Sequence, residues 1–283
     1  MLGIVALLGF LAVGQDVTPS DSTLRVMTFN IRYNNPSDGQ NAWPNRREQV
    51  ATVIQDSDAA IVGIQEALHG QVADLAALLP EYAWFGVGRD DGKEAGEYAP
   101  VFYRRDRLEL LEGETFWLSE TPNTPGSKSW DAAITRIITA CKFQDKASGA
   151  TFLLWNTHFD HRGEQARLES ARLIVRMLGA AAATQPVVVT GDFNFVPQAV
   201  PHGVLTAGGL VDARDHSTTE PVGPRGTFSG FVVRPEAPAR RIDYIFVDRA
   251  VAVERYAVID AQANGYYVSD HLPVFVAIRL APE

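Results

Sequence analysis

Apolar residues alternate with polar ones over many short stretches of the chain, a pattern typical of β-strands with one buried face. In residues 24–33, Met27 and Phe29 fall on one face, whereas Thr28 and Asn30 fall on the other. Comparable stretches predict ten further strands, at residues 59–64, 82–87, 98–103, 108–111, 134–143, 151–157, 187–190, 241–247, 251–258 and 273–280.

Three other stretches carry apolar residues at the spacing of an amphipathic helix. Asn45-Arg46-Arg47-Glu48 resembles a capping box, so its first residue is expected to cap a helix. A second helix places Val72 and Leu75 on its buried face and is stopped by Pro80. The longest predicted helix covers residues 164–183.

Predicted strands outnumber predicted helices, and neighbours such as 98–103 and 108–111 are expected to form hairpins. The fold class is therefore predicted to be α/β (α+β), with two mostly antiparallel sheets packed face to face. Helices on the outer faces would complete a four-layer α/β/β/α sandwich. The Gly- and Pro-rich residues between 195 and 240 are predicted to be loops. Residues 23–283 are expected to form one domain.

Composition narrows the classes of function. The chain has 283 residues, 46% of them hydrophobic, and a formal net charge of −9, so it lacks a broad basic surface for gripping duplex DNA. Cys141 is the single cysteine, which excludes a disulfide framework and a thiolate zinc cluster within this sequence. We expect it to be a buried strand residue.

The N-terminus resembles an export signal. Residues 2–13 are almost continuously apolar and are followed by a small-residue cleavage pattern at Ala12-Val13-Gly14. We therefore predict a signal peptide and linker at 1–22, a periplasmic or extracellular location, and no stable membrane insertion of the mature form. No Lys or Arg precedes the apolar run, so a cytoplasmic enzyme with a packed or disordered N-terminal segment is the alternative.

Polar residues gather where the predicted strands end. They are Asn30, Glu66, His158, Asp192 with Asn194, Asp243, and Asp270 with His271. Strand ends that meet at one edge of a sheet commonly carry metal ligands and proton acceptors. The sequence therefore predicts an active site at that edge.

The motifs around these residues resemble the endonuclease/exonuclease/phosphatase superfamily, which includes pancreatic deoxyribonuclease, abasic-site endonucleases, inositol polyphosphate phosphatases and bacterial sphingomyelinases. In order they are Met27-Thr28-Phe29-Asn30, Ile64-Gln65-Glu66, Asn156-Thr157-His158, Gly191-Asp192-Phe193-Asn194, Arg241-Ile242-Asp243-Tyr244 and Ser269-Asp270-His271-Leu272-Pro273-Val274. The resemblance covers nearly all of residues 24–280 and implies a deoxyribonuclease I-like fold and phosphoester hydrolysis. Asp91-Gly92-Lys93-Glu94 and residues 116–122 are similar to exported bacterial members.

Phosphoester hydrolysis requires neutralising charge on the phosphoryl oxygens and activating a water molecule. The hard oxygen ligands of Asn30, Glu66 and Asp270 suit Mg²⁺ or Mn²⁺. The resemblance implies that Glu66 is the central ligand. Capping or hydrogen bonding at a strand end is the alternative role for Glu66 and Asn30.

The resemblance also implies the catalytic roles. His271 would act on the attacking water or bind the phosphoryl group, with Asp243 holding its other ring nitrogen. Asp192 would be a base or a second-metal ligand, and Asn194 would donate to a phosphoryl oxygen.

His158 would stabilise the transition state or protonate the leaving group. By register with the deoxyribonuclease pattern, Glu97 would be its carboxylate partner, and a surface salt bridge is the alternative for Glu97. Asp160 and His161 follow closely; they either add metal ligands or, as we favour, cap the loop.

Substrate contacts are predicted for Arg32, Arg46, Trp130 and Arg136. Arginine can clamp a phosphate and tryptophan can stack on a base or sugar, whereas rim salt bridges and aromatic packing are the alternatives. The expected partner is a phosphoester, either a short nucleic acid or a small phosphorylated metabolite. A non-catalytic binding module on the same fold is the competing class of function.

Overall fold

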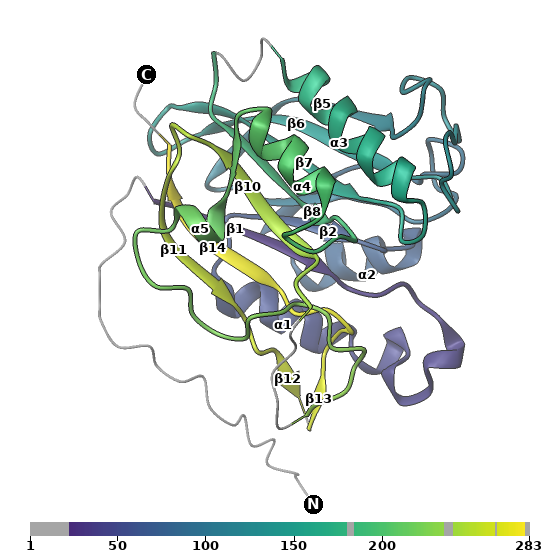
Figure 1. The fold of residues 1–283 in the computed structure, drawn as a ribbon. Coiled ribbons are helices and arrows are strands. Elements are labelled where there is room, and N and C mark those ends of the chain that lie inside the picture. Colours follow the sequence, from purple (N-terminus) through teal and green to yellow (C-terminus); the bar gives the residue numbers. More distant parts are fainter. Residues whose placement is uncertain (1–22, 180–183, 235–239, 264, 281–283) are drawn as a thin grey trace, which may run out of the picture.

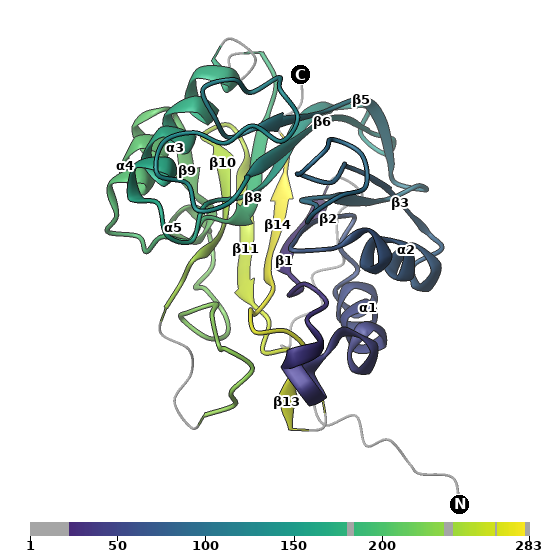
Figure 2. The same cartoon turned by 90° about the vertical axis from the view of Figure 1, so that its right-hand side faces the viewer.

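The computed structural model describes residues 23–179, 184–234, 240–263 and 265–280. Two six-stranded sheets pack face to face in the middle of the molecule, and helices cover their outer faces (Figure 1, Figure 2). This is the predicted four-layer sandwich. The predicted signal peptide and linker at 1–22 lie outside the described residues.

Each sheet combines one parallel pair of strands with antiparallel pairs, so the sheets are mixed and mostly antiparallel as predicted. The first sheet has the order β11 (Ala252–Val258), β14 (Val274–Arg279), β1 (Thr23–Asn30), β2 (Ile61–Gln65), β4 (Val101–Arg104), β3 (Tyr82–Phe85). The second has the order β5 (Leu108–Trp117), β6 (Ile137–Asp145), β7 (Thr151–His158), β8 (Val187–Asp192), β10 (Asp243–Asp248), β9 (Leu210–Asp212). The parallel pairs are β1 with β2 and β7 with β8.

Helices α1 (Arg47–Ser57) and α2 (His69–Leu78) cover the first sheet, and α3 (Glu164–Leu178) and α4 (Val200–Ala207) cover the second (Figure 2). The remaining described elements are short: η1 (Pro36–Asn41), η2 (Trp43–Asn45), α5 (Ala213–His216), and the hairpin of β12 (Gln262–Ala263) and β13 (Tyr266–Tyr267).

Three apolar layers hold the sandwich together, and strand alternation decides which layer each side chain joins. In β1, Met27 and Phe29 pack under α1 and α2, whereas Leu24 and Val26 face the other sheet. A third apolar cluster fills the space between the second sheet and α3 and α4. Asn30 therefore lies on the face between the sheets, as its spacing from Val26 predicts.

Several local predictions were wrong. Strands β4 and β5 do not form a hairpin: β4 pairs with β2 and β3, and β5 pairs with β6 in the other sheet. The chain therefore crosses from the first sheet to the second between β4 and β5, because both edges of β4 are already paired, with β2 and with β3. Asn45 does not cap α1 either. Its side chain donates to the carbonyls of Gly39 and Gln40, and the helix begins after Arg46 without a side-chain cap.

The region between 195 and 240, predicted to be loops, contains α4, β9 and α5. Pro201 lies at the start of α4, where a missing N–H has no cost. Helix α3 ends at Leu178, and residues 180–183 of its predicted span lie outside the described residues. Cys141 is buried in β6, as predicted, and burial raises the pKa of its thiol. No helix in the described ranges has the length and apolar character needed to span a membrane.

Below the predicted site, polar side chains replace apolar ones between the two sheets. Gln65 donates to Asn156 Oδ1 at 2.6 Å and to Thr28 Oγ1 at 3.0 Å, and Thr190 donates to the same Asn156 oxygen at 3.0 Å. The sheets approach closely here because Gly63 has no side chain; a Cβ atom would lie 2.3 Å from Thr190 Oγ1. These hydrogen bonds fix one sheet against the other.

Candidate active site

Strand register brings the predicted polar residues to one edge of both sheets. Asn30 ends β1 opposite Gln65 of β2, so Glu66 follows beside it. In the second sheet, Asp192 of β8 is the register partner of both His158 and Asp243. Each sheet thus contributes half of the candidate site.

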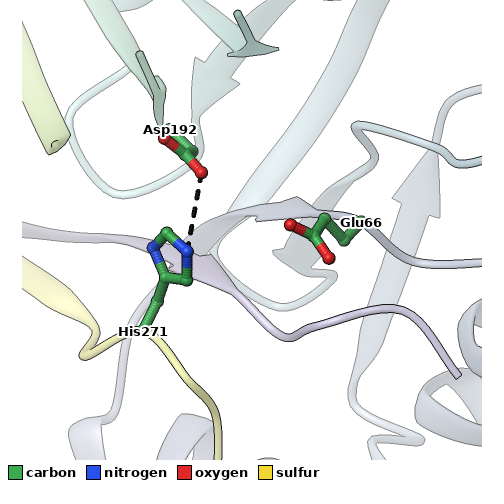
Figure 3. Close-up of side chains that lie close together, drawn as sticks. All are labelled: Glu66, Asp192 and His271. Atoms are coloured by element: carbon green, nitrogen blue, oxygen red, sulfur yellow. Dashed lines mark ion pairs between the residues drawn. The ribbon is translucent and has the colours of Figure 1, made fainter. Parts of the chain in front are cut away.

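Figure 3 shows the centre of this site, where Glu66, Asp192 and His271 point toward one another. One ligand atom from each lies within 4.8 Å of the others. Asn30 Nδ2 donates to Glu66 Oε1 at 2.9 Å and to Asp192 Oδ2 at 3.0 Å, so it bridges the two carboxylates. Glu66 turns into the site through a left-handed backbone (φ 66°), and its other oxygen accepts from the Tyr33 N–H at 3.1 Å.

His271 is held by Asp243, as the sequence predicts. Its Nδ1 lies 2.9 and 3.1 Å from the two Asp243 oxygens, and its Nε2 lies 3.7 Å from Asp192 Oδ2. Burial alone would lower the pKa of His271, but the Asp243 and Asp192 carboxylates outweigh it and raise that pKa well above its usual range. Burial and the neighbouring Asp243 raise the pKa of Asp192 to about 7.

The central donor set fits a hard divalent cation. The Glu66 and Asp192 carboxylates supply oxygens at one point, the ligand type that Mg²⁺ and Mn²⁺ prefer, and the Asn30 amide nitrogen donates to both of them. His271 is a poor ligand in this setting, because an imidazolium between two carboxylates has no lone pair to give. Glu66 is common to the predicted ligand set and to the observed cluster.

Asp270, predicted as a ligand, lies slightly apart from this cluster. Its carboxylate is 4.0 Å from Arg32 Nε, and burial raises its pKa. Arg32 also lies 3.9 Å from Glu66 and makes a two-bond ion pair with Asp38 at 3.0 and 3.2 Å. The Arg32 guanidinium thus offsets the acidic charge at the centre.

The second histidine occupies the Asp192 side of the site. His158 Nε2 lies 3.4 Å from Asp192 Oδ2 and accepts from Asn194 Nδ2 at 3.1 Å. Asn194, with a left-handed backbone (φ 52°), also donates its N–H to Asp192 Oδ1 at 2.9 Å. Burial, and then Arg136 and Arg89, lower the pKa of His158 well below its usual range, so its resting form is neutral.

Glu97 forms a salt bridge, the alternative role that the sequence left open for it. It pairs with Arg89 through two hydrogen bonds of 2.5 and 3.0 Å, and its carboxylate is 4.0 Å from His158 Nδ1, beyond hydrogen-bond distance. Burial raises the pKa of Glu97 although Arg89 opposes it. The residues around Arg89 give no sequence signal of this pairing.

The predicted substrate contacts separate into different groups. All three guanidinium nitrogens of Arg46 donate to backbone carbonyls, including those of Ile31, Arg32 and Val268. Arg46 therefore ties together the segments that carry the site, and a phosphate contact of its guanidinium stays a prediction. Arg136 is 5% exposed and lines a cavity with His158, whereas Trp130 lies at a left-handed turn (φ 56°) before β6.

Asp160 caps its loop, as we favoured. Its oxygens accept from the N–H groups of Arg162 and Gly163 at 2.9 and 2.7 Å, and of Ala133 and Ile134 at 3.0 and 3.2 Å. Burial disfavours the charged form, but these four donors outweigh it and lower the pKa of Asp160.

Asp160→Asn is expected to lower the free energy of unfolding by about 2–3 kcal/mol, because one amide oxygen cannot serve four donors. A group with a lowered folded pKa stabilises above its unfolded pKa and loses that contribution as the pH falls through the folded value. The difference in the free energy of unfolding between wild type and variant should therefore shrink as the pH falls from about 5 to about 2. Urea unfolding across this range measures it. Asp215→Asn, at an exposed side chain, is the control and should change little; an unchanged pH profile for Asp160→Asn would contradict the capping role.

Two supporting residues were missed by the sequence reasoning. Ser269 Oγ donates to the Asn30 carbonyl at 2.7 Å, and Thr227 Oγ1 accepts from the N–H groups of Ile242 and Asp243 at 3.1 and 3.2 Å. Ser269 lies in the recognised Ser-Asp-His motif, but Thr227 lies in a region predicted to be featureless loop. Its position beside Asp243 arises only from the tertiary fold.

The fold agrees with comparisons to known proteins. A model of the Endonuclease/Exonuclease/phosphatase family matches residues 27–271. An endonuclease/exonuclease/phosphatase from Bacteroides vulgatus is 44% identical, with 92% of this chain and 99% of that chain covered and a TM-score of 0.86. A mannosyl-6-phosphatase of Bacteroides thetaiotaomicron is 36% identical, with 90% and 99% covered and a TM-score of 0.85.

A more distant structure shares the fold alone. The human Nocturnin catalytic domain is 20% identical over 92% of this chain and 94% of that chain, with a TM-score of 0.71. The family match extends over both sheets and every motif from Asn30 to His271. The chain therefore belongs to the endonuclease/exonuclease/phosphatase family.

Proposed function

We propose that this chain is a divalent-metal-dependent phosphomonoesterase that acts on small phosphorylated sugars. The observation that carries the proposal is the buried cluster of Glu66, Asp192 and His271, with Asp243 holding the histidine. This arrangement places an oxygen-rich cation site next to a pair of groups that exchange a proton. A module that only binds a partner has no need of such a buried, costly set of charges.

The side chains divide the work of hydrolysis. Glu66 and Asp192, with Asn30 between them, would hold Mg²⁺ or Mn²⁺. The bound ion supplies neutralisation of phosphoryl charge and a lower pKa for water. Asp192 would take the proton of the attacking water, and the His271 imidazolium, which Asp243 keeps in place, would bind a phosphoryl oxygen.

On the other side of the phosphoryl group, Asn194 would contact its oxygens, and His158 would hold the Asn194 amide. The Asn194 amide already points to His158, so both lie on the same side of Asp192. The resting His158 is neutral and its Nε2 accepts from Asn194, so it would act on the phosphoryl group through the Asn194 amide. Arg32, 3.9 Å from Glu66, would pair with a phosphoryl oxygen.

The likeness to a mannosyl-6-phosphatase over nearly the whole length of both chains favours a sugar phosphate as the substrate. The formal charge of −9 also disfavours the backbone of a long nucleic acid. Cleavage of phosphodiesters, including short single-stranded DNA, is the competing activity.

Turnover tests the proposal directly. Mannose 6-phosphate, glucose 6-phosphate, bis-p-nitrophenyl phosphate and a short single-stranded oligonucleotide would each be incubated with Mg²⁺, Mn²⁺ or EDTA. We expect the hexose phosphates to be hydrolysed with a kcat/KM at least about 10-fold above that of the diesters, and EDTA to abolish the reaction. Preference for the diesters would replace the proposal with a nuclease or phosphodiesterase. Absence of turnover together with absence of Mn²⁺ binding would leave the binding module.

A further inference from the structure

A small cavity lies against His158 on the side of its Nδ1 atom, where Glu97 and Arg89 lie. Arg89, Glu97, Arg136 and His158 line it, together with Tyr98 and other residues. Its volume of about 10 Å³ is enough for one water-sized atom. The cavity lies off the centre formed by Glu66, Asp192 and His271, which is on the Nε2 side of the same imidazole.

Three of the lining side chains carry buried donors that no described residue satisfies. These atoms are Arg89 Nε, Arg136 Nε, Arg136 Nη1 and His158 Nδ1. The His158 tautomer follows from its other nitrogen: Nε2 accepts from the Asn194 amide, so Nδ1 carries the hydrogen. Native proteins rarely leave one buried donor unpaired, and here four belong to the walls of one cavity.

The nearest acceptors are too distant or already engaged. Asp160 Oδ2 lies 3.8 Å from Arg136 Nε and accepts from two backbone N–H groups. Glu97 Oε2 lies 4.0 Å from His158 Nδ1, which is beyond hydrogen-bond distance. A water molecule has two acceptor positions and would itself need acceptors for its hydrogens. A single anionic acceptor meets more of these donors and needs none in return.

We propose that this cavity is an anion subsite that takes one anionic atom, either a free halide or an oxygen of a second anionic group on the substrate. An anion there would accept from Arg136 and from His158 Nδ1. It would keep the hydrogen of His158 on Nδ1 and fix the orientation of the ring beside Asp192. The inference goes beyond the proposed function, and only the second of the two sources rests on that function.

The first arm of the test uses metal-free protein in EDTA. Sodium bromide replaces sodium gluconate, which is too large for the cavity, at constant ionic strength. A saturable rise in Tm of about 2–4 °C is expected for the wild type. Arg136→Lys should lose it, because lysine keeps the charge but not the two unpaired guanidinium donors. Arg241→Lys, at another arginine that is 5% exposed and pairs with Asp212, should keep it.

A bromide soak of wild-type crystals makes the result independent of the variants. An anomalous peak within hydrogen-bond distance of Arg136 and His158 Nδ1 would establish the subsite for a free anion even if Arg136→Lys does not fold.

The second arm tests whether a second anionic group of the substrate supplies the anion. With the metal-loaded enzyme, a hexose bisphosphate should have a KM at least about 10-fold below that of the hexose 6-phosphate, and Arg136→Lys should remove the difference. Equal KM values, no bromide peak and no bromide-dependent Tm would overturn the proposal in favour of an ordered water. If the protein hydrolyses no sugar phosphate, the proposed function fails, and the bromide arm alone decides the subsite.

Discussion

His271→Gln is expected to lower kcat for a phosphomonoester by about 10²–10⁴-fold, with a small change in KM. The imidazolium lies between Asp243 and Asp192, so its loss leaves these two carboxylates, one of which is the proposed proton acceptor Asp192, without the positive charge between them. Steady-state kinetics on p-nitrophenyl phosphate with Mn²⁺ measures the effect.

The chain offers a matched control for this variant. His202 Nε2 lies 3.2 Å from the buried Asp212, so His202→Gln removes the same kind of His–Asp contact away from the candidate site. Both variants should lose comparable stability, whereas only His271→Gln should lose turnover. If both retained activity, the catalytic role assigned to His271 would be wrong.

Glu66→Gln is expected to weaken Mn²⁺ binding by more than about 100-fold. Loss of a residue that only hydrogen-bonds to a metal ligand costs roughly 10–100-fold, and Glu66 is proposed as a ligand itself. Glu66 is the carboxylate shared by the predicted ligands and the observed cluster, and glutamine keeps its shape while removing its charge. Calorimetric titration of the metal-free protein with Mn²⁺ measures affinity without reference to any substrate. Turnover should fall in parallel.

The exposed Glu48 of α1 supplies the comparison, since Glu48→Gln changes the net charge by the same amount. Mn²⁺ affinity should be unchanged in that variant. Equal affinities for wild type and Glu66→Gln would instead move the cation site to other residues, with Asp270 the first to test.

Sequence pattern predicted most of the strands and the face on which Asn30 lies, because alternation reports directly which side of a strand is buried. It also identified Glu66, Asp192 and His271, since polar residues that end buried strands stand out against apolar neighbours. These are local signals, carried by residues next to one another in the chain.

The remaining features depend on partners distant in sequence. The sequence around Arg46 does not show that the carbonyl of Val268 is one of its acceptors. Glu97 could be assigned to Arg89 or to His158 only after the loop between them was placed. The placement of β4 and β5 in different sheets also depends on distant partners. The sequence of a short linker does not show whether it turns within one sheet or crosses to another.

The pairing of β1 with β14 has a consequence for biosynthesis. Strand β1, which carries Asn30, lies between β2 and the last described strand, β14. Ser269, shortly before β14 in the sequence, donates a hydrogen bond to the Asn30 carbonyl. A growing polypeptide therefore exposes one edge of β1 until residues 269–279 have left the ribosome. At about 5–20 residues per second, residues 23–268 are synthesised before the candidate site can be complete. A message truncated before codon 269 would yield a chain that lacks Asp270, His271 and the β14 partner of β1, and we expect that product to aggregate.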